Sequence, residues 1–169
     1  MTEDSDIIII GIDPGIAIVG YGIVRLQAGK VSPVAYGCIK TPSTMLQSER
    51  LNEIFRAMGK ILDQYSPVSA GIEKLFFARN TTTAMRVSEA RGVILTTLAQ
   101  RAIPVNEFTP PQVKLSITGD GKADKKGVQK MVALVLGLDH IPKPDDAADA
   151  LAIAICRANS LSLEGGSRI

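Results

Sequence analysis

The chain has 169 residues and a mass of 18.0 kDa, which is the size of one domain with one core. Hydrophobic residues make up 46% and charged residues 21% of it, a composition that excludes wholesale disorder. No apolar run approaches the roughly 18–20 residues of a membrane span, and the acidic start differs from a secretory signal. We therefore expect a protein of the cytoplasm without a membrane partner.

The formal net charge of +2 is distributed unevenly along the chain. From Lys74 to Lys130 there are ten Lys or Arg residues and four acids, which gives +6. The remainder has nine basic residues and thirteen acids, which gives −4. A basic segment favours contact with a polyanion, although an ordinary mixed surface fits the charge alone equally well.

The first half of the chain predicts four strands and one helix. Ile7–Ile12 is a β-branched run typical of a central strand buried on both faces, and Asp13-Pro14-Gly15 ends it. Two shorter strands are expected over 19–25 and 34–39, as an antiparallel meander. Apolar residues at three- and four-residue steps predict a helix over 46–65, and a fourth strand follows over 69–75.

The second half predicts a long helix, a short strand and then helices alone. The long helix is expected over 82–101, the strand over 104–108, and the last helices over 111–117, 125–136 and 146–160. Residues 161–169 contain Gly-Gly-Ser and are expected to form a flexible tail, which leaves a single domain over 1–160. This order of elements predicts an α/β fold with a mixed sheet covered by helices on both faces.

Four acidic residues interrupt apolar sequence near the ends of predicted elements. Asp13 follows the first strand, Glu73 lies in the fourth, and Asp146 and Asp149 begin the last helix. An isolated buried charge is costly, so such acids are expected to have partners. A turn could account for Asp13 and helix capping for Asp145 or Asp146, but capping does not account for Glu73. Spacing leaves open whether Asp145 or Asp146 acts with Asp149.

Carboxylates without cysteine or histidine neighbours favour a hard cation with oxygen ligands, and the chain has one histidine. Magnesium or manganese fits this set of ligands best. Two such ions about 3.5–4 Å apart can activate water and stabilise the leaving oxygen of a phosphodiester. A phosphodiester substrate would also explain the basic middle of the chain.

Six short blocks form a specific pattern over nearly the whole chain. They are GIDPG at 11–15, IEKLF at 72–76, ARG at 90–92, QVK at 112–114, GDGKADK at 119–125 and DAADAL at 146–151. In this order they resemble the RuvC family of bacterial Holliday-junction resolvases. The resemblance implies an RNase H-like fold with a five-stranded mixed sheet, a homodimer, and magnesium-dependent cleavage of four-way DNA junctions. It also implies a branch-migration motor of the RuvA and RuvB type as a partner.

The resemblance assigns the acidic residues of the site. It implies that Asp13, Glu73, Asp146 and Asp149 are catalytic and hold two Mg²⁺ ions, for which Mn²⁺ can substitute. Asp145 is then expected to cap the helix.

The resemblance also assigns residues to DNA contact. Lys114 and Lys125 are expected near the scissile phosphate, with Lys125 among the catalytic residues. Phe76 is expected to stack on an unpaired base, although packing of Phe76 and Phe77 in a strand end is an alternative. The other expected DNA contacts, for which a solvated surface fits equally well, are Arg79, Arg86, Lys122 and Lys126.

Three competing functions fit parts of the sequence. An actin-like or sugar-kinase ATPase would need two related domains, for which the chain is too short. A catalytically silent junction-binding module could do without the acids, and all four acids are present here. An RNase H-like nuclease that acts on RNA is the third. We therefore predict an endodeoxyribonuclease that nicks two symmetry-related strands in recombination and repair, leaving 5′-phosphate and 3′-hydroxyl ends.

Overall fold

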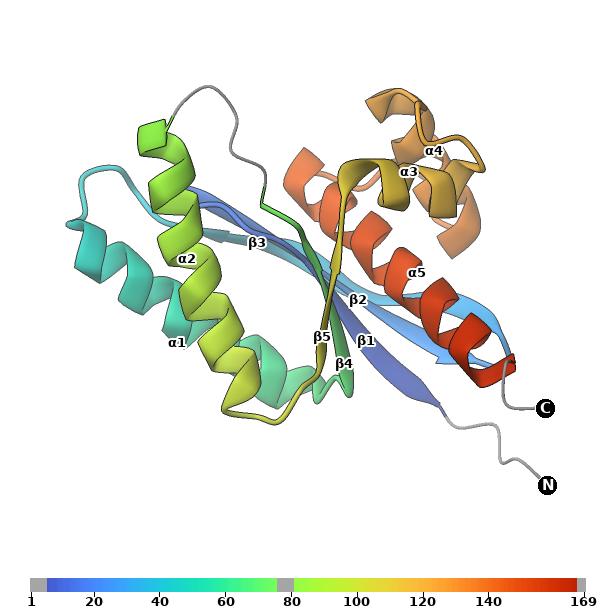
Figure 1. Cartoon of the computed structure of the whole chain (residues 1–169), viewed down its shortest axis with the longest axis horizontal. Coiled ribbons are helices and arrows are strands. Elements are labelled where there is room, and N and C mark those ends of the chain that lie inside the picture. Colours follow the sequence, from blue (N-terminus) through green and yellow to red (C-terminus); the bar gives the residue numbers. More distant parts are fainter. Residues whose placement is uncertain (1–5, 76–80, 167–169) are drawn as a thin grey trace.

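The computed structural model describes residues 6–75 and 81–166 of the chain, which form a five-stranded mixed sheet with five helices (Figure 1). The strand order is β3-β2-β1-β4-β5. The elements are β1 (Ile7–Asp13), β2 (Ile18–Gln27), β3 (Lys30–Lys40), α1 (Gln47–Tyr65), β4 (Ser69–Glu73), α2 (Thr81–Ala99), β5 (Val105–Phe108), α3 (Pro110–Thr118), α4 (Lys125–Leu136) and α5 (Asp145–Gly166). Within the described residues, no helix is both long and apolar enough to cross a membrane.

The sheet combines an antiparallel meander with a parallel half. Strands β1, β2 and β3 pair antiparallel in sequence, whereas β4 pairs parallel with both β1 and β5. Strands β2 and β3 are longer than predicted, because their pairing continues to the turn at Gln27↔Lys30. Pro33 interrupts the apolar pattern but is accepted within β3, which is an edge strand with a register shift beside it.

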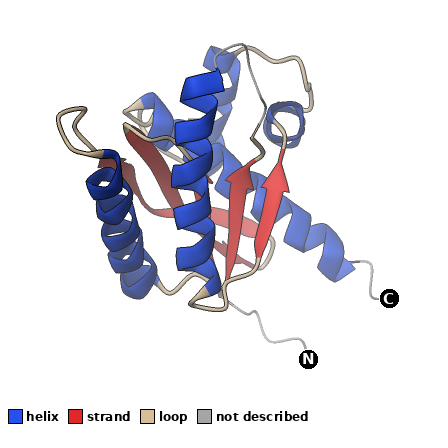
Figure 2. Ribbon diagram, turned by 60° about the vertical axis from the view of Figure 1, so that its left-hand side comes forward, coloured by secondary structure: helices blue, strands red, loops and turns tan. Residues whose placement is uncertain are grey.

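Two helical layers cover opposite faces of the sheet, as Figures 1 and 2 show. The side chains of Ile10 and Ile12 pack in one core cluster with residues of α1 and α2. Ile9 packs in the other cluster, which contains residues of α3, α4 and α5. Successive side chains of β1 thus point to opposite faces of the sheet and pack in both core clusters. This confirms the prediction of a central strand buried on both faces.

Helix α5 lies unusually close to the sheet because glycines face it. A Cβ atom added to Gly11 of β1 would lie 2.1 Å from the carbonyl oxygen of Ala150 and 2.3 Å from the nitrogen of Ala154. A Cβ atom on Gly20 of β2 would lie 2.0 Å from the carbonyl oxygen of Asp146. Only glycine allows this approach, which brings the start of α5 to the end of β1.

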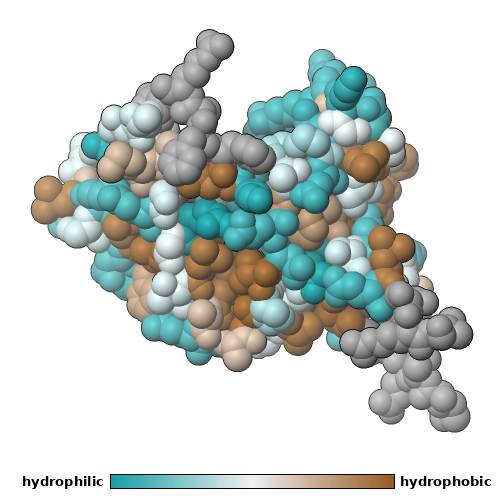
Figure 3. Space-filling view, in the orientation of Figure 1, coloured by the Kyte–Doolittle hydropathy of each residue, from teal (hydrophilic) through white to brown (hydrophobic). Residues whose placement is uncertain are grey.

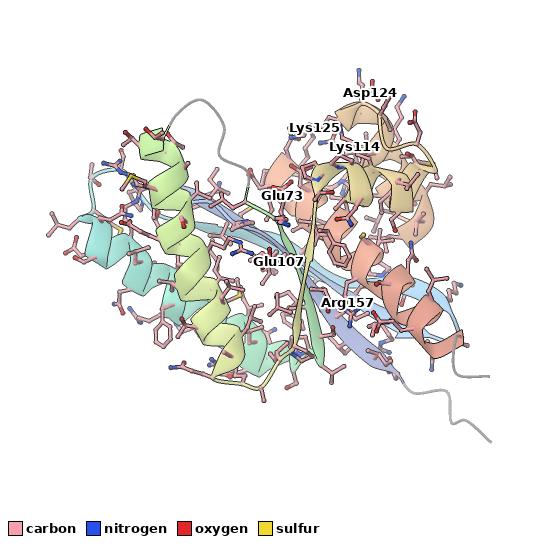
Figure 4. The ribbon with its side chains drawn as sticks, in the orientation of Figure 1. Glu73, Glu107, Lys114, Asp124, Lys125 and Arg157 are labelled. Carbon is pink, nitrogen blue, oxygen red and sulfur yellow. The ribbon has the colours of Figure 1, made fainter. Side chains whose placement is uncertain are left out.

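The described part of the predicted tail is helical, which corrects the expected end of the last helix. Residues 161–166 continue α5 to Gly166. Leu161 packs against the core, and Arg157 Nη1 lies 2.9 Å from a carboxylate oxygen of Glu164. The same arginine donates from Nε to Ser69 Oγ over 2.8 Å, which ties this half of α5 to β4 (Figure 4). The core contact of Leu161 and the ion pair within the helix accompany this extension beyond the apolar repeat.

Candidate active site

The four predicted acids come from three elements that meet at one edge of the sheet. Asp13 is the last residue of β1 and Glu73 the last of β4. These strands are parallel neighbours with Ile12 opposite Ile72, so their carboxyl ends carry the two acids side by side. The first turns of α5 carry Asp146 and Asp149.

The contact between α5 and the glycines selects Asp146 as a neighbour of Asp13. Gly20 is paired with Asp13 across β1 and β2, and it is also the glycine that touches the backbone of Asp146. Asp146 is half-buried, whereas the preceding Asp145 is exposed and points to α4. The structure thus brings Asp13, Glu73, Asp146 and Asp149 together and leaves Asp145 outside the group.

Burial and the charges of neighbouring acids raise the pKa values of three of the four acids. Burial, followed by the negative charges of Glu73, Asp149 and Asp146, raises the pKa of Asp13 to about 8. Burial and Asp149 also raise the pKa of Glu73, although a hydrogen bond with Asp13 opposes this rise. Burial raises the pKa of Asp149 against the lowering effect of Lys125. The site thus has several half-buried carboxylates, and Lys125 offsets only part of the rise in their pKa values.

The chemistry of these donors fits a hard divalent cation, since carboxylate oxygens are the ligands that Mg²⁺ and Mn²⁺ prefer. Among the described residues, however, no three acidic, histidine or cysteine side chains already stand as a set that could hold an ion. Small movements of the carboxylates would therefore have to accompany binding. A cation bound there would favour the ionised forms of these carboxylates.

Lys125 forms an ion pair with one acid of this group. It is the first residue of α4, whose start is capped by Asp124 through a 2.8 Å hydrogen bond from the Gly127 nitrogen. Its Nζ lies 3.3 Å from Asp149 Oδ2 and 3.6 Å from Asp145 Oδ2. Burial lowers the pKa of Lys125, but the two aspartates outweigh burial and raise it overall.

A cleft of about 230 Å³ connects the acids to the basic side of the molecule. Its polar lining comes from Glu73, Lys114, Lys125 and Asp149, and apolar residues of α3, α4 and α5 form the rest. In Figure 4, Glu73 lies at the tip of β4 beneath Lys114 and Lys125. The surface over α3 and α4 is mostly hydrophilic in Figure 3. The cleft therefore joins anionic and cationic groups in one hollow.

The other predicted DNA contacts are less concentrated. Lys122 lies in the turn between α3 and α4, and Lys126 in the first turn of α4; both are exposed. Arg86 is exposed on α2, which covers the other face of the sheet. Phe76 and Arg79 lie outside the described residues.

The predicted capping role of Asp145 is wrong. Asp145 is already the first residue of α5, and the backbone nitrogen of Ala147 donates to the carbonyl oxygen of Pro144 instead. The Asp145 carboxylate accepts a 3.2 Å hydrogen bond from Gln129 Nε2 and lies 3.5 Å from Lys143 Nζ. Sequence reasoning missed Gln129, although its four-residue spacing from Lys125 matches that of the two aspartates.

A five-stranded mixed sheet of this order, with acids at the ends of β1 and β4 and on α5, defines an RNase H-like nuclease. The sequence matches the family described as crossover junction endodeoxyribonuclease RuvC over residues 9–157. The chain therefore belongs to the RuvC family, whose members are metal-dependent nucleases that hydrolyse DNA.

Individual relatives agree with this assignment over most of their length. The RuvC of Heliobacterium modesticaldum is 49% identical over 155 residues, covering 92% of this chain and 96% of the relative. That of Thermosipho melanesiensis is 52% identical over 150 residues, covering 89% and 96%.

Solved structures agree as well. Thermus thermophilus RuvC has a TM-score of 0.87 and 33% identity over 94% of this chain and 97% of that one. The same protein in complex with a Holliday junction substrate has a TM-score of 0.85 and 31% identity, covering 93% and 96%. The yeast mitochondrial Holliday junction resolvase Ydc2, at 14% identity and a TM-score of 0.67, shares the fold.

Proposed function

We propose that this protein resolves four-way DNA junctions by paired nicks in two symmetry-related strands, in homologous recombination and repair. The observation that carries the proposal is that four acids come together in a RuvC-family chain and that two of them, Glu73 and Asp149, line one cleft with two lysines. The Thermus thermophilus relative in complex with a Holliday junction supports a junction as the substrate.

Two Mg²⁺ ions, for which Mn²⁺ can substitute, would be held by Asp13, Glu73, Asp146 and Asp149. Bound ions of this kind supply an activated water and stabilise the leaving oxygen. The protein contributes fixed positions of the elements that carry the carboxylates, because β1, β4 and α5 are held by strand pairing and by close packing. The products would carry 5′-phosphate and 3′-hydroxyl ends.

The cations of the cleft would hold the DNA. Lys114 and Lys125 share the cleft with Glu73. A phosphate bound there would contact the two lysines and lie next to the carboxylate. The Lys125 ammonium would offset negative charge that develops during hydrolysis. Further contacts with the DNA backbone are proposed for Lys122, Lys126, Arg79 and Arg86. Phe76 would stack on an unpaired base at the junction.

The described residues form one such centre, so cutting two strands together would require two chains. A homodimer would match its twofold axis to that of the junction and place one centre on each strand. A branch-migration motor of the RuvA and RuvB type would supply the junction, and the reaction would take place in the cytoplasm.

A synthetic mobile four-way junction with Mg²⁺, incubated beside a linear duplex and an RNA–DNA hybrid, tests the proposed function. We expect symmetric paired nicks in the junction alone. We expect Asp146→Asn to reduce nicking by at least about 100-fold while it still binds the junction. Asp139→Asn, which removes an exposed acid from the loop before α5, is the matched control and should cut normally.

The other outcomes separate the competing functions. Cleavage of the hybrid in place of the junction would indicate a nuclease for RNA. Junction binding without nicks would indicate a silent binding module. Undiminished cleavage by Asp146→Asn would refute the assignment of the acids.

A further inference from the structure

Four side chains from two neighbouring helices form a polar network at the edge of the acidic site. Lys125 and Gln129 are four residues apart on α4, and Asp145 and Asp149 are four apart on α5. Each pair therefore shares one face of its helix. Lys125 contacts both aspartates, and Gln129 contacts Asp145.

The two oxygens of Asp145 have different partners. Oδ1 accepts the hydrogen bond from Gln129 Nε2 and lies near Lys143 Nζ, whereas Oδ2 faces Lys125 Nζ at 3.6 Å. Gln129 is only 7% exposed, so its amide is held by packing. A fixed donor on one oxygen orients the carboxylate and turns the other oxygen toward Lys125.

Lys125 needs a second partner because Asp149 is a proposed metal ligand. The Lys125 ammonium lies 3.3 Å from Asp149 Oδ2. A divalent cation on Asp149 would take up the charge of that carboxylate and repel the ammonium. The Lys125 side chain is 58% exposed and could then turn into solvent.

We propose that Asp145, oriented by Gln129, is a positioning residue that keeps the Lys125 ammonium at the active site when Asp149 holds a metal ion. This inference rests on the proposed function for the role of Lys125 in cleavage. Asp145 suits the task because it contacts Lys125 directly and lies outside the acidic group around Asp13.

Junction cleavage gives the first test. Asp145→Asn preserves the shape of the side chain and removes its charge. At saturating enzyme and Mg²⁺ we expect the cleavage rate to fall about five-fold, with junction affinity unchanged within about two-fold. Asp145→Glu should restore most of the rate, and Asp139→Asn should leave it unchanged. An unchanged rate in Asp145→Asn would overturn the proposal.

A double-mutant cycle shows whether Asp145 acts through Lys125. In a Lys125→Met background, we expect Asp145→Asn to have no further effect on the cleavage rate. If the full effect persists in that background, Asp145 acts independently, for example as a metal ligand, and the proposal is wrong.

A labelling experiment tests the position of Lys125 without DNA or cleavage. With Mg²⁺ present, acetylation by an amine-reactive ester is followed at each lysine by mass spectrometry. We expect Asp145→Asn to increase the rate at Lys125 by about three-fold relative to Lys126, the exposed neighbour in the same helical turn. Equal rates in the two proteins would refute the inference. Failure of the wild type to cut any junction would instead refute the proposed function.

Discussion

At the scale of single residues, the most informative side chain is Asp13. It combines burial at the end of a central strand with three acidic neighbours, and its pKa rises to about 8. Such a group is costly to ionise in the metal-free protein, and the cost falls when a cation binds nearby. The ionisation of Asp13 is therefore expected to affect both the stability of the fold and the binding of a cation.

Asp13 predicts how the stability of the metal-free protein depends on pH. In the unfolded chain the carboxyl loses its proton near its ordinary pKa of 3.8, whereas in the folded protein it keeps the proton to about pH 8. The folded state thus binds more protons between these values, so the free energy of unfolding falls as pH rises through this window. Glu73 and Asp149, whose pKa values are also raised, act in the same direction.

Urea denaturation in EDTA at pH 6 and pH 8.5 measures this effect. We expect the free energy of unfolding of the wild type to be lower at pH 8.5 than at pH 6. The decrease should be smaller in Asp13→Asn, whose free energy of unfolding at pH 8.5 should exceed that of the wild type by on the order of a few kcal/mol. Added Mg²⁺ should stabilise the wild type more at the higher pH. Identical pH dependence in the two proteins would show that Asp13 ionises normally.

At the scale of elements, the site depends on how closely α5 approaches the sheet. Gly11 and Gly20 leave room for the helix backbone, and the helix presents Ala150 and Ala154 to β1. Small residues on both sides therefore determine the position of Asp146 and of the helix turn that carries Asp149.

A methyl group at Gly11 is expected to separate α5 from β1. Gly11→Ala would place a Cβ atom 2.1 Å from a backbone oxygen, which cannot move without shifting the helix. We expect it to lower the free energy of unfolding by about 3 kcal/mol or more, and to reduce cleavage in any protein that still folds.

Gly92→Ala is the matched control for this change. Gly92 lies within α2, and an added Cβ would meet no atom within 4 Å. Alanine should stabilise that helix by about 0.5–1 kcal/mol in urea denaturation. Equal stability of Gly11→Ala and the wild type would contradict the close packing of α5.

At the scale of the whole molecule, the charge pattern acquires a spatial meaning. Helices α3 and α4 and the turn between them lie on the α5 side of the sheet. They carry several cations of the segment between 74 and 130, among them Lys114, Lys122, Lys125 and Lys126. The acids of the site lie at the edge next to them. Part of the basic segment therefore lies beside the acidic site, and charges of opposite sign meet at the cleft.

This arrangement predicts that junction binding weakens as salt concentration rises, because phosphate contacts release counterions. Binding without Mg²⁺ is measured over a series of salt concentrations. We expect Lys122→Ala with Lys126→Ala to reduce the slope of log affinity against log salt by about one for each lysine that binds a phosphate. Lys60→Ala, on the outer side of α1, should leave the slope unchanged. Affinity independent of salt would contradict a basic DNA-binding face.

The local sequence determined the elements and the chemistry of the site. Hydrophobic periodicity predicted the strands and most helix positions, because it reflects which face of each element is buried. The acids were identified as interruptions of apolar sequence, and the six blocks indicated the family. The lengths of β2 and β3 and the end of α5 were predicted less well, because they depend on cross-strand pairing and on the packing of Leu161 against the core.

Only the tertiary structure decided how these pieces meet. Spacing could not choose between Asp145 and Asp146, because both share a helix face with Asp149. The choice depends on Gly20, more than a hundred residues earlier, which admits the backbone of Asp146 and directs Asp145 toward α4. Strand pairing and helix docking are contacts between distant parts of the chain, so their geometry cannot be deduced from local pattern alone.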